Sequence, residues 1–152
     1  MQSVKQITAQ QAADLIQDGD NVILGGFIGA VVPESIEKAI EDKFLATGHP
    51  RHLGLIFAAG QGDAKEKANN RLAHEGLVSR AIGGHWGLIP RLQKLANEGK
   101  ITGYNLPQGV ICHLFRDSAA GKMGTFTHVG LGTFVDPRVE GGKINAKTTQ
   151  DI

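Results

Sequence analysis

Short apolar runs that alternate with runs of helical periodicity constrain the fold of this chain more than any other feature. The apolar runs are typical of buried strands and cover residues 22–24, 52–59, 78–82 and 101–106. Apolar residues recur at helical spacing in residues 12–16, 33–47, 88–96 and 110–120. Strands that alternate with helices favour right-handed crossovers between parallel neighbours. The sequence therefore predicts an α/β fold with a mostly parallel sheet and flanking helices.

The predicted helices carry recognisable end signals. Thr8 and Gln11 have the spacing of a capping box before the first helix. Pro33 suits the first turn of the second helix, and Gly48 suits a left-handed cap after its last turn. Gly121 is expected to close the last helix.

Three predicted strands end in glycine or polar turns. These turns are residues 25–27 (GGF), 60–62 (GQG) and 107–109 (PQG). The carboxyl ends of parallel strands meet at one rim of the sheet, where such folds bind ligands. The N–H groups of a glycine turn can donate to a developing oxyanion. Glycine can equally serve only to permit a sharp turn, so both interpretations stay open on composition alone.

The composition is that of a single soluble globular domain. The chain has 152 residues, 41% of them hydrophobic, and a net charge of +1, so there is no basic excess of the kind that nucleic-acid binders show. Residues 1–20 lack the basic start and apolar core of a signal peptide, and no apolar run is long enough to span a membrane. With one cysteine and no leader, we expect a cytoplasmic protein without nucleic-acid or membrane partners.

Other motifs are missing or have ordinary interpretations. Neither GxxxxGK[ST] nor GxGxxG occurs, which leaves a nucleotide-binding domain of another enzyme type weakly supported. The six histidines lie at 49, 52, 74, 85, 113 and 128 without metal-ligand spacing, so we expect no metal site. We interpret Cys112 as a buried, inert thiol rather than a nucleophile, and Trp86 as core or, second, a pocket wall. Arg116 and Asp117 suit a solvated helix face.

Residues 121–143 have many glycines and threonines and no clear period. We expect a long ordered loop, functional or a partner surface, because structureless loops of this length are uncommon in compact domains. The apolar residues expected to pack and so order it are Phe126, Val129, Leu131, Phe134 and Val135.

Three separated motifs carry a resemblance to a known family. The first is Asp18-Gly19, then VIL-GGF at residues 22–27, then Pro33; the second covers residues 76–117 and the third 129–145. Together they resemble the N-terminal part of the family I CoA-transferases, in the branch that uses short-chain acyl-CoA and acetate or propionate. Val31 stands where the broad family signature has glycine, a position at which this branch varies.

The resemblance implies a covalent mechanism. A glutamate attacks an acyl-CoA, and the resulting anhydride becomes a glutamyl-CoA thioester that a second carboxylate then takes over. Coenzyme A is a substrate here, and no permanent cofactor is implied. The residues that the resemblance assigns to oxyanion and substrate binding are Gly25, Gly26, Phe27, Gln108 and Gly109. Weaker assignments to the same pocket are Gly60, Gln61 and His85.

The resemblance also places the nucleophilic glutamate and the main CoA-binding loop in a C-terminal half. Residues 1–152 are then expected to be a truncated first domain, inactive alone, whose partners are that half, acyl-CoA and a short-chain carboxylate. Neither Glu34 nor Glu75 is expected to replace the missing nucleophile. Because a shortened sheet leaves an open edge, we also expect homo-oligomers. The alternative is a non-catalytic binding or regulatory module that keeps the fold.

Overall fold

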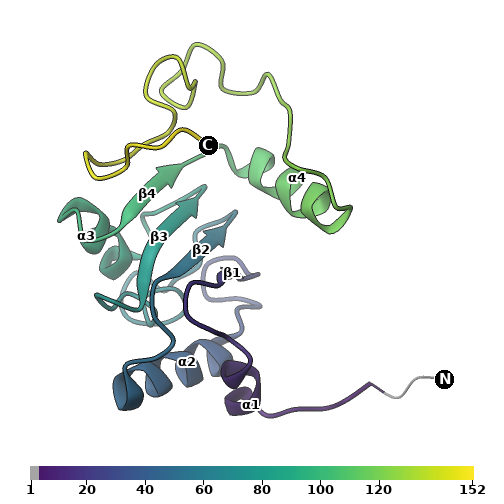
Figure 1. Ribbon diagram of the computed structural model, residues 1–152, viewed down its shortest axis with the longest axis vertical. Helices are drawn as coiled ribbons and strands as arrows, with labels where there is room; N and C mark the ends of the chain where they lie inside the picture. The colour runs from purple at the N-terminus through teal and green to yellow at the C-terminus, as the bar shows by residue number, and fades with distance from the viewer. Residues whose placement is uncertain (1–3) are drawn as a thin grey trace.

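A parallel sheet organises the molecule. The computed structural model describes residues 4–152. The strands are β1 (Asn21–Ile23), β2 (Leu53–Phe57), β3 (Val78–Gly83) and β4 (Thr102–Asn105). They are neighbours in that order and every pair is parallel, as Figure 1 shows. The predicted α/β fold is confirmed, with strand boundaries one or two residues shorter than the apolar runs at most ends.

The predicted helices are all present. They are α1 (Ala9–Asp14), α2 (Glu34–Thr47), α3 (Pro90–Asn97) and α4 (Gln108–Ala119). Thr8 and Gln11 form the reciprocal capping box, and Gly48 ends α2 at φ 75° with its N–H donating to the carbonyl of Phe44. Pro33 takes the position just before α2 instead of its first turn. No helix within residues 4–152 is long and apolar enough to cross a membrane.

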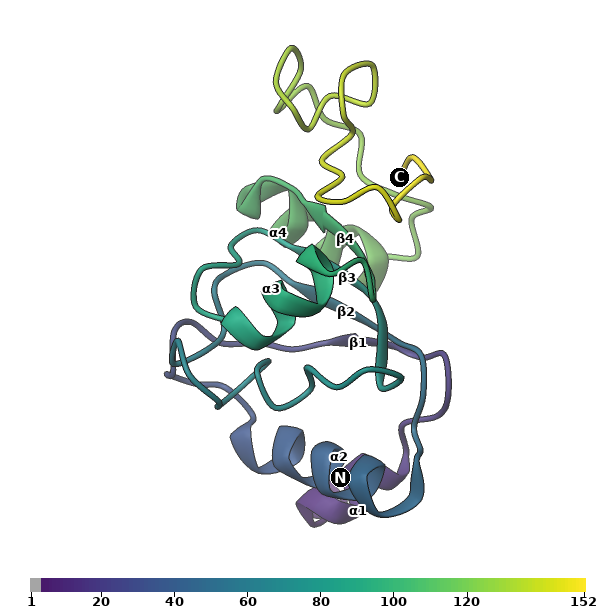
Figure 2. The ribbon, with the colours of Figure 1, turned by 90° about the vertical axis from the view of Figure 1, so that its left-hand side faces the viewer.

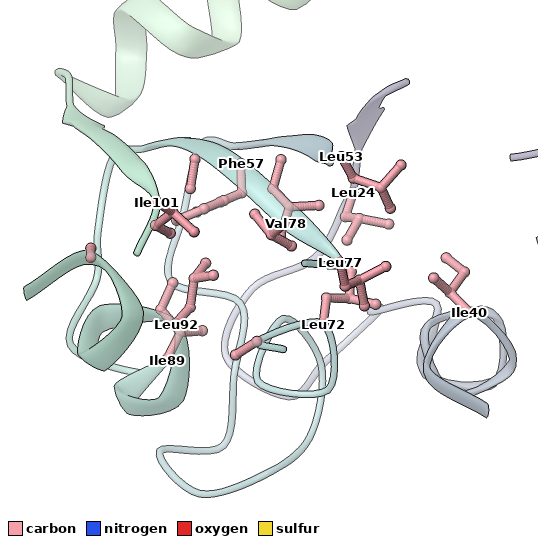
Figure 3. Close-up of a cluster of buried hydrophobic side chains, with 14 of the residues drawn as sticks. Leu24, Ile40, Leu53, Phe57, Leu72, Leu77, Val78, Ile89, Leu92 and Ile101 are labelled. Atoms are coloured by element: carbon pink, nitrogen blue, oxygen red, sulfur yellow. The ribbon is translucent and has the colours of Figure 1, made fainter. Parts of the chain in front are cut away.

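One face of the sheet carries the main core (Figure 3). Leu53, Leu55 and Phe57 alternate along β2 and are fully buried on this face. They pack against α1, α2 and α3, and Trp86 joins them as expected. The connection between β2 and β3, residues 58–77, contains no helix or strand, yet it lies against this face through Leu72, Ala73 and Leu77 (Figure 2).

The opposite face is covered only towards β4. The register aligns Ile23, Ile56, Ile82 and Tyr104 in one row across the sheet. Ile82 and Tyr104 are buried with Ile111 of α4, whereas Ile23 at the other end is 50% exposed. Because parallel sheets are normally covered on both faces, the β1 side of this face is unusually open.

The β4 edge of the sheet is closed, which the sequence analysis did not anticipate. The N–H of Asn105 donates to the carbonyl of Gly142, and the N–H of Ile144 donates to that of Gly103. The hydroxyl of Thr148 accepts from the N–H of Gly103 at 2.8 Å. Only the β1 edge therefore lacks a strand neighbour among the described residues.

Residues 121–143 form the expected loop without regular structure, but of the five apolar residues predicted to pack only Val135 is half-buried, and the other four are exposed. Phe126 is fully exposed, and Val129, Leu131 and Phe134 are 44–56% exposed. Polar anchors hold the loop instead: the buried carboxylate of Asp136 accepts from the N–H of Gly132 at 2.8 Å and from the side chain of Arg138. These polar contacts fix the shape of the loop. The loop therefore stays ordered although most of its apolar side chains are exposed.

Two interpretations on α4 are corrected. Cys112 is exposed, because the stripe of α4 that faces the sheet is set by Ile111 and Phe115. Asp117 is buried and not on a solvated face, although Arg116 is exposed as expected. The Asp117 carboxylate accepts from Lys122 Nζ and Thr125 Oγ1, each at 2.8 Å, and these two contacts hold its pKa below the usual range. It fastens the start of the loop to α4.

Candidate functional site

The turns that follow the four strands meet at the carboxyl edge of the sheet, here called the rim. The N–H of Ile28, just after the GGF turn, donates to the carbonyl of Gly60 at 2.8 Å. A side chain at Gly84, after β3, would overlap the carbonyl of Ala58 and the backbone of Gln108. The rim therefore brings together residues 25–28, 58–61, 84–85 and 107–109, as the parallel topology predicts.

The GGF turn (Gly25, Gly26, Phe27) is tight and strained. Phe27 and Ala30 exchange two backbone hydrogen bonds of 3.0 and 2.9 Å. Gly26 has φ 129°, and a Cβ there would lie 2.5 Å from Cγ1 of Val32, so only glycine fits. Ile28 also has a positive φ, of 57°, which is rare for a β-branched residue.

The turn leaves two N–H groups free. The N–H of Phe27 is used by Ala30, and that of Ile28 by Gly60. Within residues 4–152, the N–H groups of Gly25 and Gly26 donate to no protein acceptor. Gly25 is exposed, and the side chain of Phe27 is also largely outside the core. Of the three residues of the GGF turn, only the two glycines therefore have an N–H without an acceptor, and Phe27 has an exposed ring.

The PQG turn opens α4 at the same rim. The first intrahelical bonds run from the N–H groups of Val110 and Ile111 to the carbonyl of Pro107, so the N–H groups of Gln108 and Gly109 have no partner in the helix. Gln108 and Gly109 are both exposed, and the amide of Gln108 makes no hydrogen bond to another described residue. An unsatisfied helix N-terminus with a free amide suits a carboxylate.

The weaker assignments differ in what they can offer. Gln61 is 2% exposed, and its amide nitrogen donates to the carbonyls of Leu24 and Gly26, so it braces the GGF turn from beneath. Gly60 is buried, and a Cβ there would lie 2.5 Å from Nδ1 of His85. His85 itself is exposed, with its ring over Gly60.

A groove beside the rim was missed by the sequence analysis. It lies between α4 and the 121–143 loop, encloses about 470 Å³, and begins at Pro107. Its walls are mainly apolar, with Val110 and Leu114 opposite Phe126 and Leu131. A second hollow of about 570 Å³ adjoins it, and its lining includes the Asp117 carboxylate and four basic side chains. These are His113, Arg116, Lys122 and His128. The apolar residues of the loop are visible in the sequence, but only the fold shows that they line a groove with α4.

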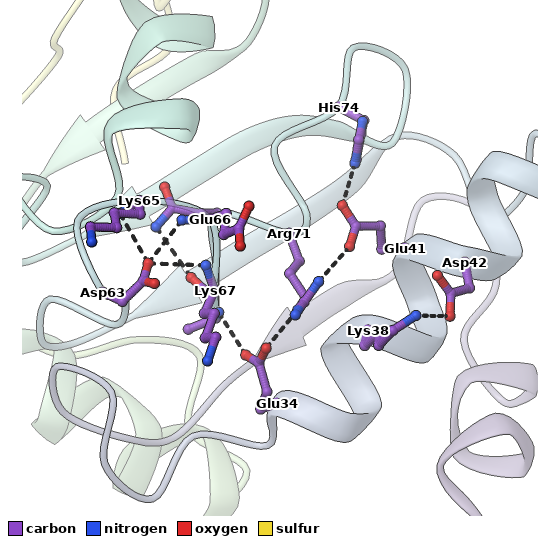
Figure 4. A network of polar contacts seen from close by, with 12 residues as sticks. Glu34, Lys38, Glu41, Asp42, Asp63, Lys65, Glu66, Lys67, Arg71 and His74 are labelled. Carbon is purple, nitrogen blue, oxygen red and sulfur yellow. Dashed lines mark hydrogen bonds and ion pairs between the residues drawn. The ribbon is translucent and has the colours of Figure 1, made fainter.

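The acidic side chains that the sequence analysis considered are occupied elsewhere. Glu34 accepts from Nε of Arg71 at 2.7 Å and from the N–H of Ala68 at 2.8 Å (Figure 4). Glu75 pairs with Lys100 on the approach to β3, at the amino end of the sheet and away from the rim. Glu34 is thus engaged in an ion pair with Arg71, and Glu75 lies away from the rim. No cluster of metal-ligating side chains occurs among the described residues.

Free N–H groups in glycine turns at the carboxyl rim of a parallel sheet have the chemistry that suits anionic or acyl ligands. The coenzyme A transferase family model matches residues 6–150. The chain is 41% identical over 147 residues, 96% of its length, to acetate CoA-transferase YdiF of Escherichia coli (strain K12). It is 45% identical over 148 residues, 97% of its length, to caffeate CoA-transferase of Acetobacterium woodii.

The fold agrees with a solved structure of the same kind. The crystal structure of the acyl-CoA transferase YdiF from Escherichia coli O157:H7, as a thioester complex with CoA, superposes with a TM-score of 0.92 at 40% identity. That match covers 95% of this chain and 30% of the other. The chain belongs to the coenzyme A transferase family, which confirms the family I resemblance. It spans 28% of the length of both curated relatives.

Proposed function

We propose that these residues form the oxyanion and acyl-binding part of an enzyme that moves coenzyme A from a short-chain acyl-CoA to a carboxylate. The observation that carries this proposal is the pair of free N–H groups at Gly25 and Gly26 on the rim of a chain that belongs to the CoA-transferase family. The name of one relative, acetate CoA-transferase, supports a small carboxylate as acceptor, whereas caffeate CoA-transferase is named for a larger, aromatic one.

The chemistry proceeds through a glutamyl-CoA thioester. A glutamate carboxylate attacks the thioester carbonyl, and the C–S bond breaks. CoA departs as the thiolate, and the acyl group stays on the glutamate as an acyl-glutamyl anhydride. The thiolate then attacks the glutamyl carbonyl and releases the first carboxylate. The second carboxylate reverses both steps and leaves with CoA, so no oxidant, reductant or net proton is needed. The thioester complex described for the E. coli O157:H7 structure supports this route.

The rim residues have separate tasks in this scheme. Each attack develops a negative oxygen, and we assign Gly25 and Gly26 to stabilise it; loss of one such donor typically lowers kcat 10²–10³-fold, about 3–4 kcal/mol. Gln108 and Gly109 would bind the carboxylate through the amide and the N-terminus of α4. His85 and the ring of Phe27 would wall the pocket.

The nucleophile and further walls are supplied from outside these residues. Glu34 and Glu75 are both engaged in ion pairs, and the curated relatives are more than three times as long as the matched segment. The half-covered sheet face and the groove beside α4 are the surfaces on which further protein would pack. Residues 1–152 alone are therefore expected to be inactive.

A CoA-exchange assay tests the function. Acetyl-CoA and propionate are incubated with the full-length protein and, separately, with residues 1–152, and propionyl-CoA is measured by mass spectrometry. We expect product only with the full-length protein. Absence of product over a series of acyl-CoA and carboxylate pairs would favour a binding module, and turnover by residues 1–152 alone would refute the assignment of the nucleophile.

A further inference from the structure

The GGF turn and the residues that follow it as far as Val31 adopt a backbone shape that their own sequence disfavours. Ile28 and Val31 are both β-branched, and both have positive φ angles, of 57° and 56°. Val31 is 93% exposed, so its own packing does little to hold it. Conformations of this kind cost about 1–3 kcal/mol each and persist only where the surrounding structure enforces them. Something outside the turn must fix its shape.

The fixing contacts come from the end of β2. Gly60 accepts from the N–H of Ile28 at 2.8 Å. Nε2 of Gln61 donates to the carbonyl of Leu24 at 2.7 Å and to that of Gly26 at 3.2 Å. One buried amide thus binds the carbonyls of Leu24 and Gly26, the two residues that flank Gly25. No other side chain within residues 4–152 donates to a carbonyl of the GGF turn.

Holding a carbonyl also sets the direction of an N–H. The carbonyl of Leu24 and the N–H of Gly25 belong to one planar trans peptide, in which the two groups point in opposite directions. Because Leu24's carbonyl faces Gln61 in the interior, the N–H of Gly25 faces away from it. The contact to Gly26 directs the N–H of Phe27 in the same way, towards Ala30.

The amide of Gln61 is itself held. Its Oε1 accepts from Nδ2 of Asn69 at 3.4 Å, and its carbonyl accepts from the N–H of Asn69 at 3.2 Å. Asn69 is fully buried in the β2–β3 connection. With Oε1 turned towards Asn69, Nε2 is left to face the turn.

We propose that Gln61 is a positioning residue for CoA transfer: its amide fixes the Leu24–Gly25 peptide so that the Gly25 N–H points at the developing oxyanion. This inference rests on the proposed function. Gln61 need not touch the substrate and acts through the turn. The predicted weak pocket role of this residue is thereby replaced by a role beneath the pocket.

The test compares Gln61→Leu with Asn145→Leu in the full-length protein. Asn145 is a matched control because its Nδ2 also bridges two carbonyls, those of Ala96 and Ile101, at 2.7 and 2.9 Å. Both variants lose one bridging amide, and Asn145 lies on the far side of β4 from the GGF turn. We expect kcat to fall about 10–100-fold for Gln61→Leu with KM for acyl-CoA changed less than about threefold. Asn145→Leu should lower the melting temperature comparably with kcat within about twofold of wild type.

The pH dependence of kcat in Gln61→Glu is a readout that a purely structural role of Gln61 would not change. An ionised carboxylate would repel the carbonyls of Leu24 and Gly26, whereas a protonated one can donate one hydrogen bond. The kcat of Gln61→Glu relative to wild type should therefore rise at least about fivefold between pH 8 and pH 6. The same ratio for Gln61→Leu should stay flat.

Hydrogen exchange separates this inference from the proposed function. Exchange of the two hydrogen-bonded amides of this segment, those of Phe27 and Ile28, should be at least about tenfold faster in Gln61→Leu than in wild type and unchanged in Asn145→Leu. Unchanged exchange in Gln61→Leu, or equal losses of kcat in both variants, would overturn the inference. If the wild-type protein shows no CoA transfer, the proposed function fails, and unchanged or accelerated exchange still decides whether Gln61 holds the turn.

Discussion

At the scale of single residues, Glu37 is the buried group whose charge the fold controls most strongly. Its side chain is fully buried on the core side of α2, and neither carboxylate oxygen has a hydrogen-bond partner. Burial and, second, the nearby charge of Glu34 raise the pKa of Glu37 to about 7. Since the pKa in the unfolded chain is near 4.5, the folded state binds the extra proton between these values. Stability from this group is complete below about pH 4.5 and is lost as the pH rises through 7.

Glu37→Gln should remove that pH dependence. The neutral amide mimics the protonated acid, so the variant should be within about 1 kcal/mol of wild type at pH 5 and exceed it at pH 8 by as much as about 3 kcal/mol in unfolding free energy. Urea denaturation at both pH values measures this. Glu140→Gln, which changes an exposed acid, should alter neither value. A wild-type stability that is equal at pH 5 and pH 8 would show that Glu37 is not the buried acid described here.

Gly26→Ala tests the oxyanion turn directly. Its φ of 129° and the overlap with Val32 leave no room for a methyl group, so the turn must shift. We expect kcat to fall at least about 100-fold, the effect of losing one oxyanion donor. Gly29→Ala is the control just after the turn, because a Cβ there meets nothing within 4 Å and its φ is not positive. Similar kcat values for both variants would argue against a catalytic role of the turn.

At the scale of elements, the β2–β3 connection contains no helix, and ion pairs attach it to α2 (Figure 4). Arg71 donates to Glu34 and to Glu41, and His74 contacts Glu41 at 2.8 Å. These charges are largely buried: Arg71 is 20% exposed and Glu41 11%. Because the same connection carries Gln61 and Asn69, its attachment to α2 also supports the rim.

Arg71→Met should destabilise the protein by about 2–3 kcal/mol. The change leaves Glu34 and Glu41 without their shared cation in a poorly hydrated place, and the partial exposure keeps the loss below that of a fully buried pair. Lys38→Met removes the exposed pair with Asp42 and should cost only a few tenths of a kcal/mol. Thermal or urea unfolding of both variants measures the two losses of unfolding free energy. Equal losses would mean that the Arg71 network stabilises the protein no more than a surface ion pair does.

How far the elements could be predicted depends on where their signals lie. Capping at Thr8 and the glycine after α2 are local interactions, and the structure contains both. The exposure of Cys112 and the burial of Asp117 depend on which stripe of α4 meets the sheet, which no local pattern specifies. For the same reason, the sequence located the turns of the rim, whereas the bracing position of Gln61 required the fold.

At the scale of the whole molecule, apolar surface gathers at one end. Met123 and Phe126 are fully exposed, and the groove beside α4 runs under the same loop. Apolar patches of this kind mark surfaces that pack against other protein. The β1 edge and the open part of the sheet face lie at the other side of the sheet and form a separate uncovered surface.

Residues 1–152 alone should therefore self-associate through the loop. Phe126→Ser should shift the material towards monomer, whereas Leu15→Ser, which changes an exposed apolar residue just after α1, should not. Light scattering over a concentration series measures this. A clean monomer for the unmodified residues 1–152 at high concentration would contradict the expectation.

The covalent route and the place of its nucleophile are tested together by oxygen transfer. When a carboxylate labelled with ¹⁸O takes CoA through an acyl-glutamyl anhydride, one labelled oxygen remains on the glutamate. The full-length protein turns over acetyl-CoA with excess ¹⁸O-propionate and is then digested. The masses of its peptides are measured by mass spectrometry. We predict heavy oxygen in one glutamate peptide outside residues 1–152 and in no acidic peptide within them. Turnover without label in the protein, or label on an acid within residues 1–152, would contradict the account.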